Sequence, residues 1–163
     1  METALKNKIE KVVINCGIGR LATNTNNFEE KVLPDLIKEL SLIAAQKPAA
    51  RSAKKSIAGF KLRMGNVVGL KATLRGKRME QFLGRLIKVV LPRVRDFRGI
   101  DLKNVDGSGN LNIGIKEHLV FPEINPEESR VNFGLQITIV PNVKSREEAI
   151  ELYRKLGVPL KKV

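Results

Sequence analysis

The side chains best suited to chemistry in this sequence lie in one short central segment, residues 53–65. It holds four cations, Lys54, Lys55, Lys61 and Arg63. Lysine and arginine displace counterions when they bind phosphates, which is a main source of affinity for nucleic acids. Phe60 adds an aromatic face on which an unpaired base can stack, and Gly59 lets a phosphate approach the backbone closely. The segment therefore indicates a basic loop that binds nucleic acid.

The net charge of the chain, +13, is concentrated in the same region. Residues 46–98 hold 15 of the 30 lysines and arginines but only 2 of the 17 acidic residues, so the remainder carries 15 of each sign. A soluble protein needs only a modest net charge with both signs mixed over its surface. A block of one sign therefore indicates a polyanionic partner, either nucleic acid or an anionic membrane.

Of these two polyanions, the composition favours RNA. Proteins that bind a membrane surface usually present an exposed Trp, Phe or Leu face beside their basic residues. This chain has no Trp and one Tyr, and its Phe residues mostly occupy positions expected in the core or in turns. No stretch approaches the roughly 18 apolar residues that a membrane span needs. A membrane partner is therefore not expected.

A glycine motif, Gly17-Ile-Gly-Arg-Leu-Ala22, follows the first apolar run and offers an enzymatic alternative. In dinucleotide-binding folds such glycines form a tight turn that brings a pyrophosphate to a helix N-terminus. Here residues 23–27 have the composition of a loop, and no acidic residue ends a second strand at the expected distance. The motif favours a turn from strand to loop, with a nucleotide-dependent enzyme as the alternative.

Candidates for catalysis and metal binding are few. His118 is the only histidine, at a predicted strand edge, and it favours a structural or surface role because no partner for a catalytic triad is evident. Cys16 is the only cysteine, which excludes an internal disulfide and a zinc site of several cysteines. At the end of an apolar strand it is expected to be a small buried hydrophobe. The sequence predicts no catalytic residue, no metal site and no cofactor.

The elements that position these residues follow from hydrophobic periodicity. Runs of β-branched or alternating apolar residues predict strands at 11–16, 47–52, 67–74, 111–115 and 135–140. Residues 53–65 lie between two of these strands and have little periodicity, so they are expected to form a long loop or an irregular hairpin. Asp106-Gly-Ser-Gly109 predicts a turn before the fourth strand.

Three helices are expected from apolar residues at helical spacing. The first should begin near Asn26 or Asn27 and run to about residue 43, with a kink or a later start at Pro34. The second covers residues 79–90 and should stop at Pro92, and the third extends from 145 to 157. Strands in runs, mixed with helices, predict an α+β fold: a mainly antiparallel sheet with helices packed on one face, in a single domain over residues 1–163.

Several stretches together resemble one known family. They are Val12–Asn15 with Gly17 and Gly19, Gln46–Pro48, Lys54–Arg63, Thr73–Gly76, Pro92–Gly99, Asp106–Asn110 and Phe121–Ile124. Their order and spacing resemble the bacterial-type ribosomal protein L-five family over nearly the whole chain. The stretches at 92–99 and 121–124 are the most specific in combination.

The resemblance implies a structural protein in the central protuberance of the large ribosomal subunit. Family members bind 5S rRNA, help to join it to the large-subunit rRNA, contact P-site tRNA and touch a protein of the small-subunit head. The positions that match the family's 5S rRNA contacts are Asn15, Gln46, Lys47, Phe60, Thr73 and Arg75. The loop that matches the segment reaching toward P-site tRNA contributes Lys54, Lys55, Ser56, Gly59, Lys61 and Arg63.

The contact with the small subunit is expected in the acidic stretch 121–130. Its carboxylates, Glu123, Glu127 and Glu128, would suit a basic ribosomal protein. The resemblance also implies neighbouring proteins of the central protuberance as partners and a bacterial cytoplasmic ribosome as the location, with an organellar ribosome as the alternative. An RNA chaperone or regulator outside the ribosome is a further alternative.

The chain departs from the family pattern in two places. Family members usually carry a helical extension before the first strand, whereas about ten residues precede it here, so contacts made by that extension are not carried over. His118 stands where the family tends to have an amide, which indicates a local difference.

Overall fold

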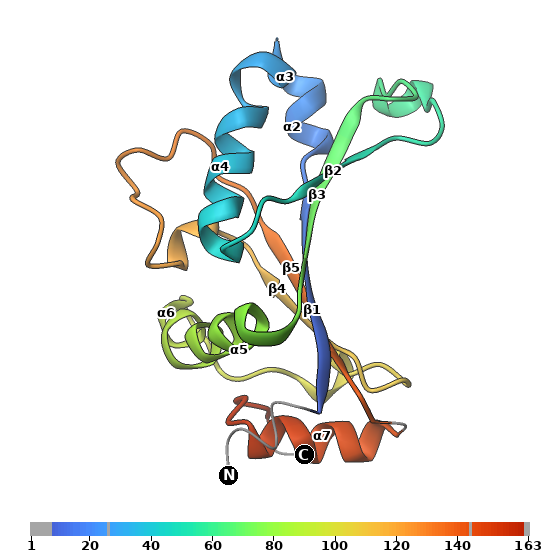
Figure 1. Ribbon diagram of the computed structural model, residues 1–163. Helices are drawn as coiled ribbons and strands as arrows, with labels where there is room; N and C mark the ends of the chain where they lie inside the picture. The colour runs from blue at the N-terminus through green and yellow to red at the C-terminus, as the bar shows by residue number, and fades with distance from the viewer. Residues whose placement is uncertain (1–7, 26, 144, 162–163) are drawn as a thin grey trace.

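A computed structural model describes residues 8–25, 27–143 and 145–161 (Figure 1). Residues 1–7, before the first strand, lie outside these described residues. So does Asn26, one of the two predicted helix caps. Five strands form one sheet: β1 (Ile9–Gly17), β2 (Ala49–Ser52), β3 (Val67–Leu74), β4 (Leu111–Ile115) and β5 (Leu135–Pro141). Their order is β2-β3-β1-β5-β4, and every neighbouring pair is antiparallel. The predicted strands and the antiparallel sheet are confirmed.

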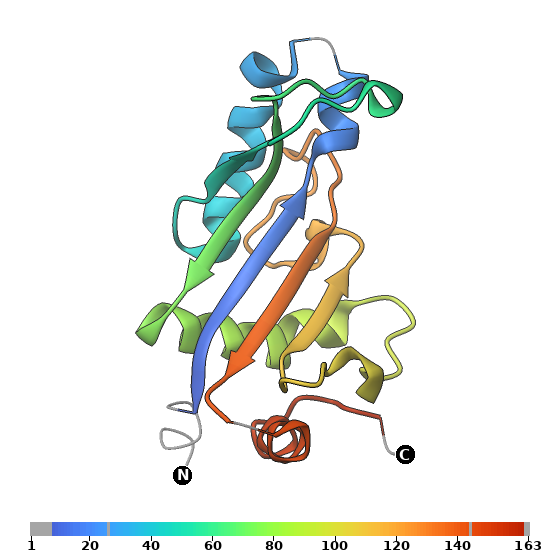
Figure 2. The ribbon, with the colours of Figure 1, turned by 90° about the vertical axis from the view of Figure 1, so that its right-hand side faces the viewer.

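The helices lie on one side of this sheet and leave the other side uncovered (Figures 1 and 2). They are α2 (Gly19–Asn24), α3 (Phe28–Lys31), α4 (Leu33–Ala44), α5 (Gly76–Arg85), the π-helical turn η2 (Leu86–Val90), α6 (Leu91–Arg93) and α7 (Arg146–Lys155). Short 3₁₀ turns are η1 (Ala58–Phe60), η3 (Leu102–Asn104) and η4 (His118–Val120). Helix α7 lies across the end of the sheet where β1 begins. The α+β fold with helices packed on one face is confirmed.

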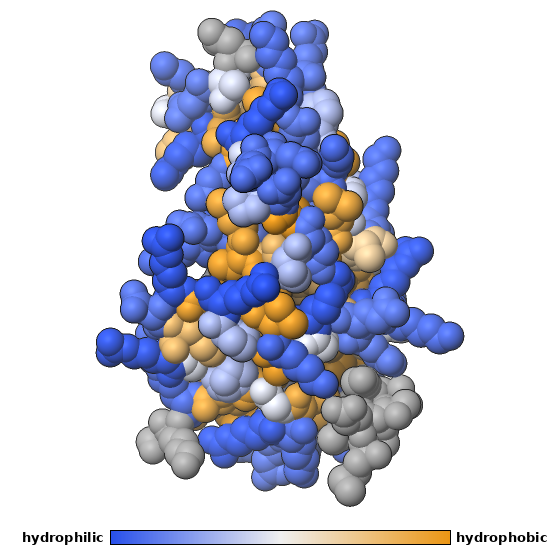
Figure 3. Space-filling view, turned by 90° about the vertical axis from the view of Figure 1, so that its left-hand side faces the viewer, coloured by the Kyte–Doolittle hydropathy of each residue, from blue (hydrophilic) through white to orange (hydrophobic). Residues whose placement is uncertain are grey.

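Strand alternation decides which side chains face the helices. On β1, Val12, Ile14 and Cys16 are buried, whereas Val13 and Asn15 point to the uncovered side. The apolar side of the sheet packs on the buried stripes of α4 and α5, and one hydrophobic cluster connects β1, β3, β4 and β5 with these helices. Figure 3 shows the helical side, where apolar side chains gather in the middle of the face among polar ones.

Helix α2 corrects one expectation, because the residues after the glycine motif are helical through Asn24 rather than a loop. The backbone leaves β1 through a hydrogen bond from Ile18 N–H to the carbonyl of Val68 on β3 (3.0 Å). Leu21 and Ala22 then pack against the core. A tertiary contact therefore stabilises this helical turn, although its composition is typical of a loop.

The first long helix is interrupted as Pro34 suggested. It consists of α3 and α4, which are joined at Val32. Pro34 lies in the first turn of α4. Proline is tolerated there because backbone N–H groups in the first turn have no hydrogen-bond partner within the helix. Asn27 precedes α3 in a left-handed conformation, with φ 55°, and its side chain makes no capping hydrogen bond. The expected break is confirmed, but side-chain capping by Asn27 is not.

The second helix does not stop at Pro92, which corrects the expected end. Helical backbone continues from α5 through η2 and α6 as far as Arg93. The π-helical turn lies directly before the proline, and such wider turns occur where a helix accommodates a break in its regular bonding. The extension moves the end of the helix to the arginine-rich stretch that follows.

Among the described residues, every helix is too short or too polar to cross a bilayer.

Candidate nucleic-acid interface

The uncovered side of the sheet carries a polar and basic surface, which we call the open face. It is made of Lys11, Val13, Asn15, Arg51, Lys71, Thr73, Asn112, Gln136 and Thr138. The register places Lys71, Asn15 and Gln136 side by side on three neighbouring strands. On the next row, the hydroxyl of Thr138 donates a hydrogen bond to Oδ1 of Asn112 (2.7 Å). No described helix covers this surface (Figure 2).

The open face is hollowed at one end by three glycines, which carry no side chain. Gly17 on β1 lies opposite Gly69 on β3, and Gly134 precedes β5 nearby. The resulting shallow depression has a volume of about 480 Å³, and its polar lining comes from Asn15, Arg51, Lys71 and Gln136. Amides and cations around a hollow with no bulky side chain can hydrogen-bond to ribose or a base while they contact phosphate.

A second group of predicted residues meets at the β3 edge of the sheet. The side-chain amide of Gln46 donates to the backbone carbonyl of Thr73 (3.3 Å), and Arg78 Nη1 donates to Gln46 Oε1 (3.4 Å). Residues far apart in sequence are thus brought together beside Arg75. Lys47 is exposed next to Gln46. Arg78 was not among the predicted contacts, and the only signal for it was its place in the basic block.

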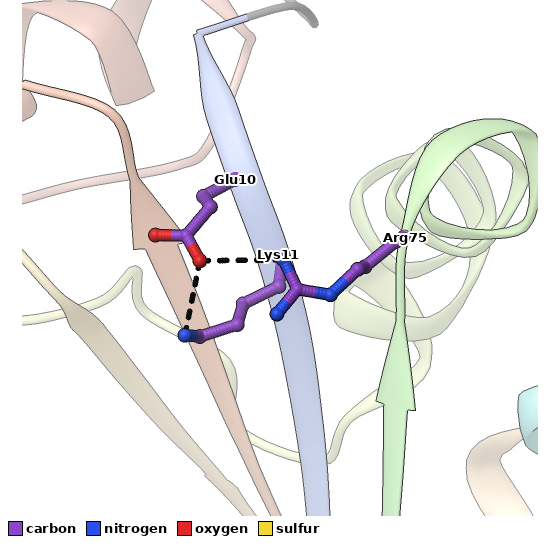
Figure 4. Close-up of polar contacts among 3 residues, drawn as sticks. All are labelled: Glu10, Lys11 and Arg75. Carbon is purple, nitrogen blue, oxygen red and sulfur yellow. Dashed lines mark hydrogen bonds and ion pairs between the residues drawn. The ribbon is translucent and has the colours of Figure 1, made fainter.

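Arg75 forms an ion pair that the sequence did not predict (Figure 4). The carboxylate of Glu10 on β1 accepts hydrogen bonds from Lys11 Nζ at 3.1 Å and from Arg75 Nη1 at 3.3 Å. These two cations, Lys11 first and then Arg75, hold the pKa of Glu10 below its usual range. Glu10 therefore stays ionised at neutral pH and offsets part of the positive charge at this edge.

Phe60 lies at the other end of β3 from Arg75. Residues 53–65 form an irregular hairpin, as expected, in which Ile57 and Leu62 exchange two backbone hydrogen bonds around η1. The Ser56 hydroxyl accepts a hydrogen bond from the backbone N–H of Met64 (2.9 Å). At its tip, Phe60 is 73% exposed. Because eight strand residues span about 26 Å, Phe60 and Arg75 belong to separate parts of the surface.

The basic side chains predicted for the loop surround this tip. Lys54, Lys55, Ser56, Gly59 and Lys61 are exposed, as is Arg63. No described acidic side chain forms an ion pair with them. The structure therefore gathers these predicted residues into one exposed, positively charged hairpin.

The predicted acidic residues border one groove on the helical side. It has a volume of about 410 Å³ and lies between α4 and residues 121–130, lined by Asp35, Lys38, Glu39, Leu42, Glu123, Ile124, Asn125, Glu127, Glu128, Ser129 and Arg130. Glu123 accepts a hydrogen bond from Arg85 of α5, and its other oxygen, Oε2, is buried without a hydrogen-bond partner among the described residues. We call this feature the acidic groove. Its carboxylates outnumber its cations, so it favours a positively charged partner.

His118 supports the acidic groove from inside. Its ring is fully buried, stacks on Phe133 with centroids 3.9 Å apart, and accepts the Phe133 backbone N–H at Nδ1 (3.4 Å). Nε2 lies 2.9 Å from Glu39 Oε2 and 3.0 Å from the Ser129 hydroxyl. Burial lowers the pKa of His118, although the nearby Glu39 carboxylate acts in the opposite direction. The structural role is confirmed, but in an interior 3₁₀ turn rather than at a strand edge.

The remaining chemical candidates do not form a site. Cys16 is buried, and burial raises the pKa of its thiol to about 12, so it is a core hydrophobe as expected. Nowhere in the described part of the chain do three or more metal-binding side chains gather.

Comparison with known proteins identifies the family. Residues 5–63 match the family model described as Ribosomal protein L5, and residues 67–160 match the model of the ribosomal L5P family C-terminus. The chain belongs to the ribosomal protein L5 family. The resemblance seen in the sequence is confirmed. Members of the L5 family are structural ribosomal proteins, so the nucleotide-dependent enzyme is excluded.

Bacterial relatives support the same assignment. The chain is 52% identical over 155 residues to the large ribosomal subunit protein uL5 of Oenococcus oeni, covering 95% of this chain and 83% of that protein. It is 50% identical over 155 residues to the uL5 proteins of Oceanobacillus iheyensis and Limosilactobacillus fermentum, again covering 95% of this chain and 84% and 83% of theirs. The L5 assignment therefore applies to nearly the whole chain.

Proposed function

We propose that this L5 protein binds 5S rRNA on its open face and along the β3 edge, as a structural component of the large subunit of a bacterial cytoplasmic ribosome. The supporting observation is the uncovered row of Lys71, Asn15 and Gln136, which lies beside the group formed by Gln46, Thr73 and Arg75. A sheet face left without helices, yet polar and basic, is a ready platform for folded RNA.

The chemistry of this surface suits RNA better than a simple polyanion. Amide side chains of Asn15 and Gln136 can both donate to and accept from ribose hydroxyls or base edges. Lys71 and Arg51 flank the depression and supply the phosphate contacts that set affinity and its dependence on salt. The protein thus combines positioning by phosphate contacts with a few contacts that can distinguish RNA features.

The ion pair at Arg75 provides a test in two opposite directions. Arg75→Gln should weaken binding of a 5S rRNA transcript several-fold at low salt, because it removes a phosphate contact. Glu10→Gln should strengthen binding, because it removes the anion that offsets Arg75 and Lys11. Filter binding with unlabelled tRNA as competitor measures both effects, with Lys31→Gln on the helical side as a charge control.

The outcome that would refute the proposal is equally direct. A folded protein that does not bind 5S rRNA at low ionic strength does not carry this function. Equal effects of Arg75→Gln and Lys31→Gln would place the binding surface elsewhere.

The exposed hairpin at residues 53–65 is the proposed contact with P-site tRNA. Its cations form no ion pair with any described acidic side chain. Its tip presents Phe60 and Met64 to solvent. Replacing Lys54, Lys55 and Lys61 by Gln should reduce cross-linking of ribosome-bound P-site tRNA to this protein while assembly into the subunit is retained. Unchanged cross-linking would contradict this assignment.

The acidic groove is the proposed contact with a basic protein of the small-subunit head. Glu127→Lys with Glu128→Lys should weaken association of the two subunits, because like charges then face each other. Exchange of Glu147 and Glu148 on α7 for Lys is the matched control. Sucrose gradients measure subunit association and also separate a ribosomal protein, which sediments with large subunits, from an RNA chaperone that stays at the top.

A further inference from the structure

The large hydrophobic side chains that lie exposed in the described part of the chain belong to two surfaces. Ile57, Phe60 and Met64 are on the hairpin at residues 53–65, and Leu42 of α4 lines the acidic groove. A base can stack on the ring of Phe60, but the aliphatic side chains offer RNA no such face. Exposed apolar groups beside charges are instead typical of surfaces that bind protein. Contacts with RNA alone therefore leave part of these surfaces unexplained.

The hairpin and the acidic groove carry opposite charge. The hairpin has four cations and no acidic residue, whereas the groove is lined by five carboxylates and two cations. Two of the carboxylates are contacted from inside the fold, by His118 and Arg85. The other three, Asp35, Glu127 and Glu128, form no ion pair with a cation in the described part of the chain. The two surfaces are thus complementary in charge, and both offer apolar side chains.

Backbone hydrogen bonds fix the shape of both surfaces. At the base of the hairpin, the Gly65 N–H donates to the carbonyl of Ala53 (3.0 Å). In the loop that borders the groove, the Asn125 carbonyl accepts from the N–H of Glu128, and Asn125 Oδ1 accepts from the N–H of Glu127, both at 3.2 Å. Because these segments are already ordered, less conformational entropy is lost when they dock.

The hairpin and the groove lie on opposite sides of the molecule, so one copy does not bring them together. Figure 1 shows the hairpin beyond β2 and β3 on one side and residues 121–134 beside α4 on the other. The turned view of Figure 2 shows the same residues 121–134 behind the sheet. A contact between the two surfaces therefore needs a second copy of the chain.

We propose that the protein outside the ribosome associates head to tail, with the hairpin of one copy docked in the acidic groove of the next. The cations of the hairpin then face carboxylates, and its apolar side chains meet Leu42. The net charge of +13 opposes association. However, the Debye length is about 8 Å at physiological ionic strength, so repulsion between distant charges is screened while opposite charges in contact still attract.

This arrangement has two structural consequences. Each copy uses two different surfaces, so the contact is heterologous and leaves a free hairpin and a free groove at the ends of a short chain of copies. The buried area is small for a protein interface, so we expect association in the micromolar range. The contact covers the surfaces proposed above for tRNA and for the small-subunit head, and it leaves the open face free. Self-association and those two contacts therefore exclude each other.

Sedimentation velocity of the full protein, freed of RNA, tests the proposal at about 0.15 M salt. The groove variant carries Glu127→Lys and Glu128→Lys, and its control of equal net charge carries Glu147→Lys and Glu148→Lys on α7. The hairpin variant carries Lys54→Glu and Lys55→Glu, and its control carries Lys31→Glu and Arg154→Glu. All eight positions are exposed. Each variant should associate about tenfold or more weakly than its control, because like charges replace opposite ones.

A mixture of the two variants gives a more specific readout. The groove variant retains an intact hairpin, and the hairpin variant retains an intact groove, so the mixture contains one complete contact. Equimolar amounts should form a 1:1 dimer with the affinity of the parent contact and no larger species. Both variants keep a net positive charge, so attraction between whole molecules does not explain such a dimer.

Leu42→Gln tests the apolar part of the contact without a change in charge. Leu42 is exposed, so the substitution should leave the midpoint of thermal unfolding nearly unchanged. It should weaken self-association about fivefold or more, because a polar amide replaces the apolar side chain that meets the hairpin. Unchanged association would place the contact outside the groove and overturn the inference.

The remaining outcomes are equally decisive. A parent protein that stays monomeric at all micromolar concentrations overturns the inference, and so does an association that ribonuclease abolishes. Equal association of the variants and their controls, or a mixture that stays monomeric, would also overturn it. Since no RNA enters this experiment, failure of 5S rRNA binding would refute the proposed function and leave this inference intact.

Discussion

At the scale of single residues, Phe60 is the side chain whose replacement is most informative. It lies at the tip of the hairpin with most of its ring in solvent, so Phe60→Ala should leave the free energy of unfolding nearly unchanged. If the ring stacks on a base, the substitution should cost about 1–3 kcal/mol of RNA-binding free energy. Filter binding with 5S rRNA and with tRNA identifies which RNA the ring contacts.

Met64→Ala is the matched control for Phe60, because Met64 is 70% exposed in the same hairpin. Equal effects of the two substitutions would indicate a general apolar contact rather than stacking. Unchanged affinity for both RNAs after Phe60→Ala would contradict the predicted role.

His118 allows a prediction about pH, because it is the only histidine in the chain. Its pKa in the folded protein is lowered from the ordinary value of 6.5, chiefly by burial, so the unfolded chain binds the proton more readily. The folded state should therefore have its full stability above about pH 6.5 and lose stability as the pH falls toward the lowered pKa. Urea unfolding at pH 5.5 and 7.5 measures the difference.

His118→Gln should flatten this pH dependence, since an amide does not titrate. The absolute stability of the variant can fall without affecting the test, because the readout is the change with pH. An equally steep decline in the variant would assign the titration to another group.

At the scale of elements, the docking of α7 depends on a close contact at Gly109. Gly109 has φ +83°, and a Cβ atom placed there would lie 2.8 Å from the Cβ of Ala149 on α7. Its carbonyl also accepts a hydrogen bond from the buried hydroxyl of Tyr153 (2.8 Å). Gly109→Ala should therefore destabilise the fold by about 2–4 kcal/mol, from left-handed backbone strain and a clash of packed groups.

Gly107→Ala, two residues away in the same turn, is the natural control, because a Cβ atom there meets nothing within 4 Å. Thermal unfolding followed by circular dichroism should show a much smaller shift for this variant. Similar losses for both would mean that turn flexibility, rather than the contact with α7, determines stability here.

At the scale of the whole molecule, the two segments matched by the family models share one sheet. Strands β1 and β2 come from residues 5–63 and the other three from residues 67–160, and β1 lies between β3 and β5. Because the hydrophobic cluster also spans both segments, we predict that the chain unfolds in a single cooperative transition, as one domain. Far-ultraviolet circular dichroism and Tyr153 fluorescence should report the same midpoint, and two separated midpoints would indicate two domains.

The amino-acid sequence by itself determined the features that depend on local periodicity and composition. Alternation of apolar residues predicted the strands, as in β5, and the density of cations predicted the exposed hairpin at 53–65. These features could be predicted because a strand repeats every two residues and a helix every 3.6, and because unpaired charges remain in water. The order and spacing of several short stretches were enough to indicate the family.

Only the tertiary structure decided which residues meet and which face stays open. Gln46 reaches Thr73, Glu10 reaches Arg75, and His118 lies buried beside Glu39 because strand register and helix packing join distant parts of the chain. The same long-range contacts make α2 helical through the bond from Ile18 to Val68, against the local preference of its sequence. Such contacts leave no periodic signal, since they depend on the packing of elements rather than on the spacing of residues within one.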